Sequence, residues 1–294
     1  MTKIKKAIFP VGGLGTRFLP VTKALPKEML PVASKPLIQY AFEEAVNAGI
    51  EEFIFITGRN KNVINNHFDC VYELEKFLDE KEKHDALQIT RDWVPTPGKI
   101  AFIRQQQPLG LGHAIWCARH FVQDEPVAVL LADELFRSTR SPSLLSEMVE
   151  LYHKTNANII AVADVAPNQT SNYGIIKPAE DDGTQVQIVD MVEKPSPELA
   201  PSNTSIVGRY IIHPEIFDLL ERTPKGSGGE IQLTDALRAN LATRQTIGYR
   251  FSGKRYDCGN HLGFFQANVE FAINDPLMGK QAREILKTIV KDMI

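Results

Sequence analysis

The sequence predicts an α/β protein with a Rossmann-like, mostly parallel or mixed central sheet flanked by helices. Four short segments are almost entirely apolar, and segments of helical pattern alternate with them. Strands that are apolar on both faces are typical of a parallel sheet covered by helices on each side. Such a sheet binds its ligand at the carboxyl ends of its strands. The four expected strands are Ala7–Val11, Phe53–Thr57, Ile100–Arg104 and Val127–Ala132.

Helices are expected between these strands. Pro36 opens a helical pattern that continues to Asn47, and Gly49 provides a stop shortly after it. The charged stretch Val71–Lys83 has the composition of a solvated helix, and Gly112–Phe121 follows the third strand as another helical segment. The alternation of strand and helix is what a parallel sheet requires, because parallel neighbours need a crossover connection.

From about Asp164 the pattern changes to shorter strand candidates separated by turn-rich segments such as Glu180–Gly183. This predicts a small antiparallel extension of the sheet. There is no internal repeat and no flexible linker, so a single domain over residues 1–294 is expected, in three parts: 1–165, 166–260 and the C-terminal helices of 261–294. The strands expected in the extension are Gly174–Lys177, Val186–Val192 and Ser205–Ile212, and the later helices are 214–220, 233–241, 261–273 and 280–294.

Charge and cysteine content exclude several classes of protein. The net charge of −3 over 294 residues provides no cationic field for nucleic acid or an acidic membrane. No apolar run approaches the roughly 20 residues that span a bilayer. The three cysteines form no CxxC pair, which argues against a disulfide framework or a zinc site and suits a reducing cytosol. A cytoplasmic protein without a nucleic-acid or membrane partner is therefore expected.

A glycine-rich loop, Val11–Pro20, comes directly after the first strand. Glycine lets backbone N–H groups approach a phosphate closely, but such a loop can equally be structural. It is neither a Walker A loop nor a complete dinucleotide fingerprint, because GxxxxGK[ST] and the third glycine are both absent. Arg17 lies in this loop and Lys27 lies ten residues later, in a proline-rich segment that we expect to be extended. Two cations held there can clamp a polyphosphate.

The segment GGLGTRFLPVTKALPKEMLPV, followed by KPLIQY, closely resembles the signature of the bacterial UTP–glucose-1-phosphate uridylyltransferases, which belong to the sugar-nucleotide pyrophosphorylases. The resemblance continues in the expected order and covers nearly the whole chain. Its further motifs are Gly110–His113, Asp133, Glu193–Pro195, Pro201–Asn203, Val207–Tyr210, Gly229–Asp235 and Asp257–Asn260.

This resemblance implies a fold of the nucleotide-diphospho-sugar transferase type, with a nucleotide-binding half in 1–165 and a sugar-phosphate half in 166–260. The implied reaction is the Mg²⁺-assisted in-line attack of glucose 1-phosphate on UTP, giving UDP-glucose and pyrophosphate. It needs no covalent intermediate and no general base, because the attacking phosphate is already an anion. The resemblance also implies a homo-oligomer, dimer or tetramer, with the C-terminal helices as contacts.

The resemblance assigns roles to individual residues. Glu28 resembles an acidic residue that accepts from the uracil ring, whereas related thymidylyltransferases tend to carry glutamine beside the lysine. Asp133 matches a metal-binding aspartate, and Asp257 is its implied second carboxylate. The remaining implied groups are the nucleotide-binding Gly12, Gly13, Gly15, Gln105 and Gly110, the catalytic cations Arg17, Lys27 and Lys194, and the sugar-phosphate residues Gly174, Glu193 and Lys194.

Other interpretations of these residues remain open. Asp133 could cap a helix, and Asp257 could equally belong to a turn. Gln105 is chosen from three consecutive glutamines by its distance from Gly110, and His113 is expected to pack rather than to bind a ligand. At the level of function, the alternatives are the same reaction with dTTP, a non-catalytic sugar-nucleotide sensor, and a dinucleotide-dependent oxidoreductase.

Overall fold

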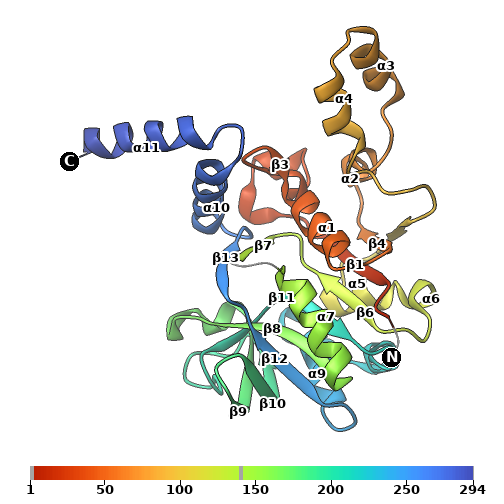
Figure 1. Cartoon of the computed structure of the whole chain (residues 1–294). Coiled ribbons are helices and arrows are strands. Elements are labelled where there is room, and N and C mark those ends of the chain that lie inside the picture. The colour runs from red at the N-terminus through yellow and green to blue at the C-terminus, as the bar shows by residue number, and fades with distance from the viewer. Residues whose placement is uncertain (1–2, 139–141, 294) are drawn as a thin grey trace.

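The computed structural model describes residues 3–138 and 142–293, and a nine-stranded mixed sheet forms its centre (Figure 1). The α/β fold class predicted above is confirmed. In spatial order the strands are β5 (Ile100–Arg104), β4 (Glu52–Thr57), β1 (Lys6–Val11), β6 (Val127–Leu130), β11 (Thr204–Ile212), β8 (Asn158–Asp164), β12 (Thr246–Arg250), β10 (Gln185–Glu193) and β9 (Gly174–Asp181).

The first four strands are all parallel, as their apolar composition predicts. Ala7 of β1 lies opposite Phe53 of β4 on one side and Ala128 of β6 on the other. This register brings the loops that follow β1 and β6 to the same edge of the sheet.

The second half of the sheet is mainly antiparallel, as expected, but it is continuous with the first half. Strand β11 pairs antiparallel with β6 through Arg209–Ile212 and with β8 on its other side. Every residue of β11 is buried, because the strand lies in the middle of the sheet. Two short ribbons complete the strands: β13 (Gly253–Asp257) with β7 (Glu134–Ser138), and β2 (Pro31–Val32) with β3 (Lys35–Pro36).

Helices cover both faces of the sheet and bury one apolar cluster on each. On one face, α1 (Leu37–Asn47) and α7 (Leu144–Thr155) pack on a cluster that contains the stacked rings of Phe9 and Phe55, whose centroids are 4.8 Å apart. The opposite cluster contains Ile8. The helices on that side are α5 (Leu111–Trp116), α6 (Arg119–Val122), α8 (Ile216–Arg222) and α9 (Leu233–Asn240).

One expected helix is divided. The segment 112–121 forms α5 and α6, with a turn at Cys117 and Ala118 between them. Neither residue is a helix breaker, so composition could not predict the turn.

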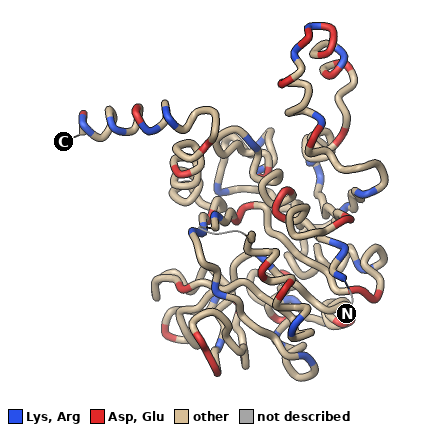
Figure 2. Tube along the Cα trace, viewed as in Figure 1, with Lys and Arg blue, Asp and Glu red and all other residues tan. Residues whose placement is uncertain are grey.

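Two helical elements extend beyond the sheet (Figure 1). The first is an arm made of α2 (Asn62–His67), α3 (Tyr72–Glu80) and α4 (His84–Arg91), which carries side chains of both charges (Figure 2). The second is the C-terminal pair α10 (His261–Asn274) and α11 (Gly279–Met293), of which α11 projects away from the rest of the chain. Within the part of the chain that the structure describes, no helix combines the length and apolar character needed to cross a bilayer.

Candidate functional site

Two adjoining cavities open at the edge of the sheet where β1 and β6 end. The glycine-loop cavity, of about 420 Å³, and the carboxylate cavity, of about 520 Å³, share Leu111, Leu131 and Asp133 in their walls. All of the predicted site residues line one or both. The glycine-loop cavity contains Gly12, Gly13, Gly15, Lys27, Glu28, Gln105 and Gly110, and the carboxylate cavity contains Arg17, Gly174, Glu193, Lys194 and Asp257.

The glycine loop turns sharply after β1. Gly15 has a φ of 67°, a left-handed conformation that favours glycine, and it precedes the 3₁₀ turn η1 (Thr16–Phe18). A side chain at Gly12 would come within 3.1 Å of the Gln105 amide oxygen. The expectation of an extended segment after the loop is wrong, because two further 3₁₀ turns follow: η2 (Val21–Lys23) and η3 (Lys27–Met29). The prolines do exclude a longer helix: Pro20 and Pro26 directly precede the two turns, and Pro31 begins β2.

Lys27 and Glu28 are neighbours in η3 but bind different partners. The Nζ of Lys27 lies 2.5 Å from Oδ2 of Asp133. Glu28 is 1% exposed, and its Oε2 accepts a hydrogen bond of 2.8 Å from the Nζ of Lys61. Its other oxygen, Oε1, is buried and has no hydrogen-bond partner among the described residues. Such an atom costs free energy unless a ligand supplies a donor.

Both members of the Lys27–Asp133 pair are held in their charged forms. Burial lowers the pKa of Lys27, but the Asp133 and Glu28 carboxylates outweigh it and leave that pKa above its ordinary value. Burial acts to raise the pKa of Asp133, and the Lys27 ammonium reverses this to give a lowered pKa.

Asp133 lies in a tight turn between β6 and β7 and not at a helix start, so the helix-cap interpretation is wrong. A buried arginine, Arg209 of β11, is hydrogen-bonded to the backbone of this turn. Its guanidinium donates to the carbonyl oxygens of Leu131 and Glu134 at 2.8 and 2.9 Å, and it pairs with Glu44 at 2.8 Å. The backbone on both sides of Asp133 is therefore fixed to the central strand.

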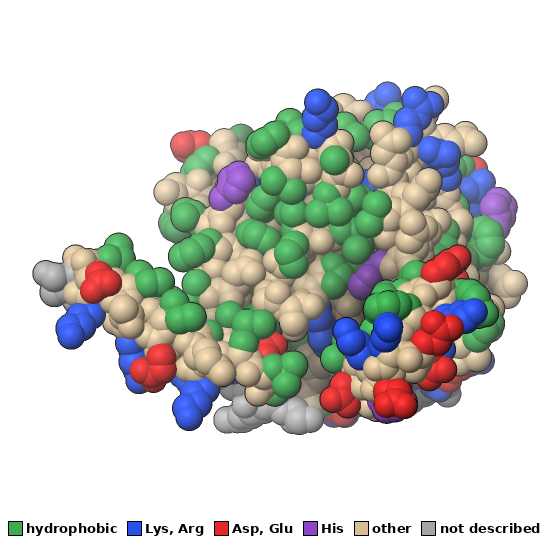
Figure 3. Space-filling view, turned by 90° about the horizontal axis from the view of Figure 1, so that it is seen from above, with side chains coloured by type: hydrophobic (Ala, Val, Ile, Leu, Met, Phe, Trp, Pro, Cys, Tyr) green, Lys and Arg blue, Asp and Glu red, His purple; other side chains and the backbone are tan. Residues whose placement is uncertain are grey.

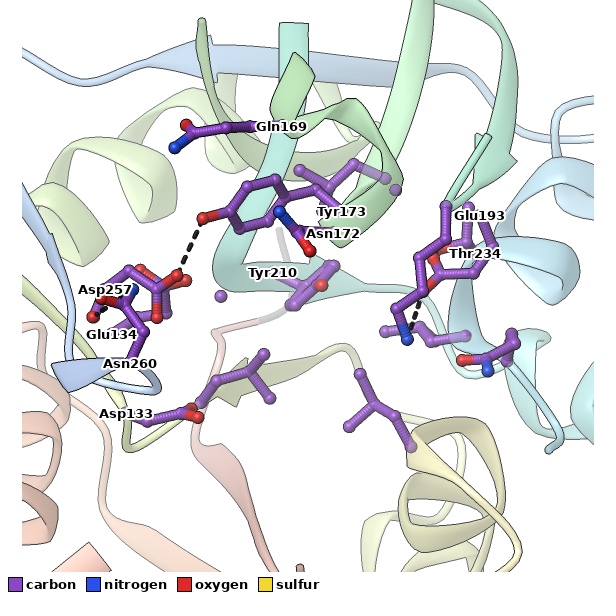
Figure 4. A pocket seen from close by; sticks show the side chains of 18 of the residues that line it. Asp133, Glu134, Gln169, Asn172, Tyr173, Glu193, Tyr210, Thr234, Asp257 and Asn260 are labelled. Atoms are coloured by element: carbon purple, nitrogen blue, oxygen red, sulfur yellow. Dashed lines mark hydrogen bonds and ion pairs between the residues drawn. The ribbon is translucent and has the colours of Figure 1, made fainter. Parts of the chain in front are cut away.

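Asp257 ends β13 and faces the same space. The hydroxyl of Tyr173 donates to its Oδ2 at 2.8 Å (Figure 4), and the N–H of Gly259 donates to Oδ1 at 2.9 Å. A Cβ atom on Gly259 would lie 2.9 Å from Oδ1 of Asp257 and 3.1 Å from Oδ2 of Asp133. Glycine therefore leaves room for the two carboxylates to approach each other. Asp257 is the last residue of β13 and directly precedes the turn at Cys258 and Gly259, and it lines the carboxylate cavity together with Asp133. Its place beside a turn therefore does not exclude a role in that cavity.

Arg255 and Glu134 lie near Asp257 and were not predicted as site residues from the sequence. Arg255 forms a bidentate ion pair with Glu134, with distances of 2.6 and 2.5 Å, and its guanidinium lies 4.9 Å from the centre of the Tyr173 ring. Burial raises the pKa of Glu134 to about 7, although Arg255 acts in the opposite direction. The only sequence signal was the acidic residue that directly follows Asp133.

The far end of the carboxylate cavity holds the predicted sugar-phosphate residues. Oε2 of Glu193 accepts a hydrogen bond of 2.6 Å from Thr234, and Oε1 lies 3.4 Å from the Nζ of Lys194 (Figure 4). A Cβ at Gly174 would approach the Thr234 hydroxyl to 2.9 Å, so glycine is required for this close packing. Gln169 and Asn172, which the sequence did not single out, also line this cavity.

Part of the wall of the glycine-loop cavity is formed by Gln105. Its amide nitrogen donates to the carbonyl of Gly110 at 3.1 Å and lies 3.0 Å from Nδ1 of His113. Gly110 has a φ of 104°. His113 thus orients a cavity residue, in agreement with its expected packing role.

The carboxylates offer a sparse site for a metal ion. Within residues 3–138 and 142–293 there is no cluster of three or more His, Cys, Asp or Glu side chains that would hold one. Mg²⁺ usually takes only one or two carboxylates and completes its shell with water and substrate phosphates. Asp133 and Asp257 fit that donor set.

Known proteins resemble this chain over nearly its whole length. The family model for nucleotidyl transferases matches residues 6–273. A UTP–glucose-1-phosphate uridylyltransferase of Bacillus subtilis is 47% identical over 100% of this chain and 98% of its own. A solved UTP-bound UGPase from Acinetobacter baumannii superposes with a TM-score of 0.90 at 40% identity, over 96% of this chain and 98% of the other. A solved UDP-glucose pyrophosphorylase complexed with UDP-glucose gives a TM-score of 0.83 at 45% identity, over 91% and 98% of the two chains. The resemblance seen in the sequence is confirmed, and the chain belongs to the nucleotidyl transferase family, among the bacterial UTP–glucose-1-phosphate uridylyltransferases.

Proposed function

We propose that this enzyme transfers the uridylyl group of UTP to glucose 1-phosphate, giving UDP-glucose and pyrophosphate. The observation that carries the proposal is the meeting of two cavities at Asp133, one lined by the glycine loop and one by Glu193 and Lys194. Relatives that are named for this reaction, and solved relatives with UTP or UDP-glucose bound, support the choice of substrates.

The glycine-loop cavity takes the nucleotide, so residues 1–165 supply most of that half of the site. Oε1 of Glu28 is an acceptor without a partner among the described residues, and Glu28 lines this cavity; the N3–H of uracil is a donor of the right kind for it. Cytosine presents a lone pair at N3 and would repel this oxygen. Thymine carries the same N3–H as uracil, so the choice of UTP over dTTP must rest on the 5-methyl group and the ribose.

The phosphates lie between Lys27 and Arg17. Lys27 is positively charged at neutral pH and stands at the boundary of both cavities through its pairing with Asp133. Arg17 lines the carboxylate cavity and donates to the carbonyl of Gly259 at 3.3 Å. Both cations can neutralise the charge that develops on the leaving pyrophosphate. The attacking phosphate is an anion, so no side chain has to remove a proton.

Nucleotidyl transferases of this family generally use a divalent metal. We assign Mg²⁺ to Asp133 and Asp257, where it would supply positive charge to the phosphate oxygens. Tyr173 and Gly259 hold Asp257 in place for this purpose.

The carboxylate cavity takes the sugar phosphate, largely through residues 166–260. Glu193 is oriented by Thr234 and accepts from sugar hydroxyls, while Lys194 binds the phosphate. Gly174 leaves space beside Glu193 and Thr234 that a Cβ atom would fill.

We also propose that the enzyme is a cytoplasmic homo-oligomer, dimer or tetramer, that contacts its partner through the C-terminal helices. Hydrophobic side chains lie along α11 in Figure 3, and Ile285, Ile289 and Val290 are 48–60% exposed there. These positions recur at helical spacing, so they form one apolar stripe. Light scattering of the wild type and of an Ile285→Ser, Ile289→Ser variant tests the proposal, and an unchanged mass would contradict it.

The reaction itself is tested by pyrophosphate release from purified protein with glucose 1-phosphate and Mg²⁺. UTP should be strongly preferred over dTTP, ATP, CTP and GTP. A preference for another nucleotide would retain the mechanism and overturn the base assignment. No release with any nucleotide, from folded protein, would favour a sugar-nucleotide sensor.

A further inference from the structure

A buried lysine, Lys61, pairs with Glu28. Lys61 immediately precedes α2, and it is 6% exposed. It is not among the described residues that line either cavity. A buried ammonium is costly unless it is paired, and the partner of Lys61 is Oε2 of Glu28, at 2.8 Å. A lysine so placed can act on the substrate only through Glu28.

The two oxygens of Glu28 therefore differ. Oε2 is occupied by Lys61, while Oε1 is buried, unpaired among the described residues, and belongs to a side chain of the cavity wall. A carboxylate fixed in this way presents a single acceptor. Burial raises the pKa of Glu28, and the Lys61 and Lys27 ammonium groups oppose that shift. Without Lys61, the carboxyl group would bind a proton more readily and would also become a donor.

We propose that Lys61 determines base specificity as a positioning residue: it fixes Glu28 so that Oε1 only accepts hydrogen bonds, and the site thereby selects a pyrimidine with N3–H over one with a lone pair at N3. The proposal rests on the proposed function, because it presumes that the glycine-loop cavity takes the nucleotide. It assigns to Lys61 a role that is separate from phosphate chemistry.

The test compares kcat/KM for UTP and CTP, with glucose 1-phosphate and Mg²⁺, in wild type and in Lys61→Met. The UTP-to-CTP ratio should fall by about tenfold or more in the variant. The fall should lie mainly in KM, and kcat at saturating UTP should change much less. Lys61→Arg keeps the charge and should retain most of the ratio.

A double-mutant cycle identifies the route of the effect. Glu28→Gln alone should lower the ratio, and adding Lys61→Met to it should change the ratio little further, because Lys61 acts through the Glu28 carboxylate. If Lys61→Met does not fold, Lys61→Gln, which keeps a donor but no charge, answers the question with the same measurement.

An unchanged UTP-to-CTP ratio in a folded Lys61→Met or Lys61→Gln variant would overturn the proposal, even if both activities fall, since that pattern indicates a purely structural lysine. A wild type without any preference for UTP would instead refute the proposed function. The two failures are therefore distinguishable.

Discussion

Replacement of Lys27 by methionine separates the catalytic role proposed for this lysine from its structural role. Methionine keeps much of the aliphatic volume and removes the charge. The side chains of Lys27 and Asp133 are 24% and 23% exposed, so their ion pair is neither fully solvated nor fully buried. Loss of one partner should therefore cost about 1–2 kcal/mol of unfolding free energy, between the values for surface and buried pairs. This corresponds to a fall in Tm of only a few degrees.

The expected loss of activity is much larger. A charged group that stabilises developing negative charge in an active site contributes about 10²–10³ in kcat, or roughly 3–4 kcal/mol. Asp133 loses a competing cation in the variant, so the Mg²⁺ concentration for half-maximal activity should not rise. Lys23→Ala, an exposed lysine in the preceding 3₁₀ turn, is the matched control and should leave kcat unchanged.

Steady-state pyrophosphate release at saturating UTP and glucose 1-phosphate, together with a thermal melt, measures both quantities. Near-normal kcat in Lys27→Met would refute the catalytic assignment. A fall in kcat that is matched by a large fall in Tm would show that the pair is mainly structural.

Three further predictions concern the metal, the glycines and pH. Asp257→Asn should raise the Mg²⁺ concentration for half-maximal activity about tenfold or more, measured by titration of metal into EDTA-treated enzyme; an unchanged titration would leave Asp257 as a turn residue only. Gly110→Ala should lower the free energy of unfolding by about 1–3 kcal/mol more than Gly98→Ala, because both have positive φ but only a Cβ at Gly110 would clash, at 2.7 Å; equal losses in chemical denaturation would contradict this. Arg250 hydrogen bonds hold the pKa values of two aspartates in β8 and β9 below their ordinary range. Their stabilisation is therefore present above about pH 4 and is lost as the pH falls through the lowered values. Arg250→Met should cost below about 1 kcal/mol at pH 7 and nothing near pH 2, and a difference that grows in acid would contradict the assignment.

The sequence predicted the parts of the fold that depend on local pattern. The four parallel strands are correct to within two residues. Strands β1, β4 and β6 are buried along almost their whole length, which requires apolar residues, whereas β5 lies at the edge of the sheet and is only partly buried. The position of β11 could not be predicted, since an apolar segment does not say which strands become its neighbours. The turn between α5 and α6 could not be predicted either, because no residue there is incompatible with a helix.

The candidate site also has a part that the sequence predicts and a part that it does not. The residues named from the sequence lie in short motifs, and the structure brings all of them to two adjoining cavities, whereas Gln169 and Asn172 of the same lining carried no signal. The supporting contacts could not be predicted, since they join residues far apart in the chain. Lys61 meets Glu28 across 33 positions, and Arg255 meets Glu134 across 121. Each pair depends on tertiary packing that no local pattern encodes.

The antiparallel pairing of β11 with β6 also limits how the molecule can move. The two halves of the sheet are hydrogen-bonded through the register from Arg209 opposite Leu130 to Ile212 opposite Val127, and Arg209 is fully buried there. A hinge between the halves would have to break these bonds and expose that guanidinium. The pairing therefore favours motion of the loops around the two cavities over separation of the two halves of the sheet.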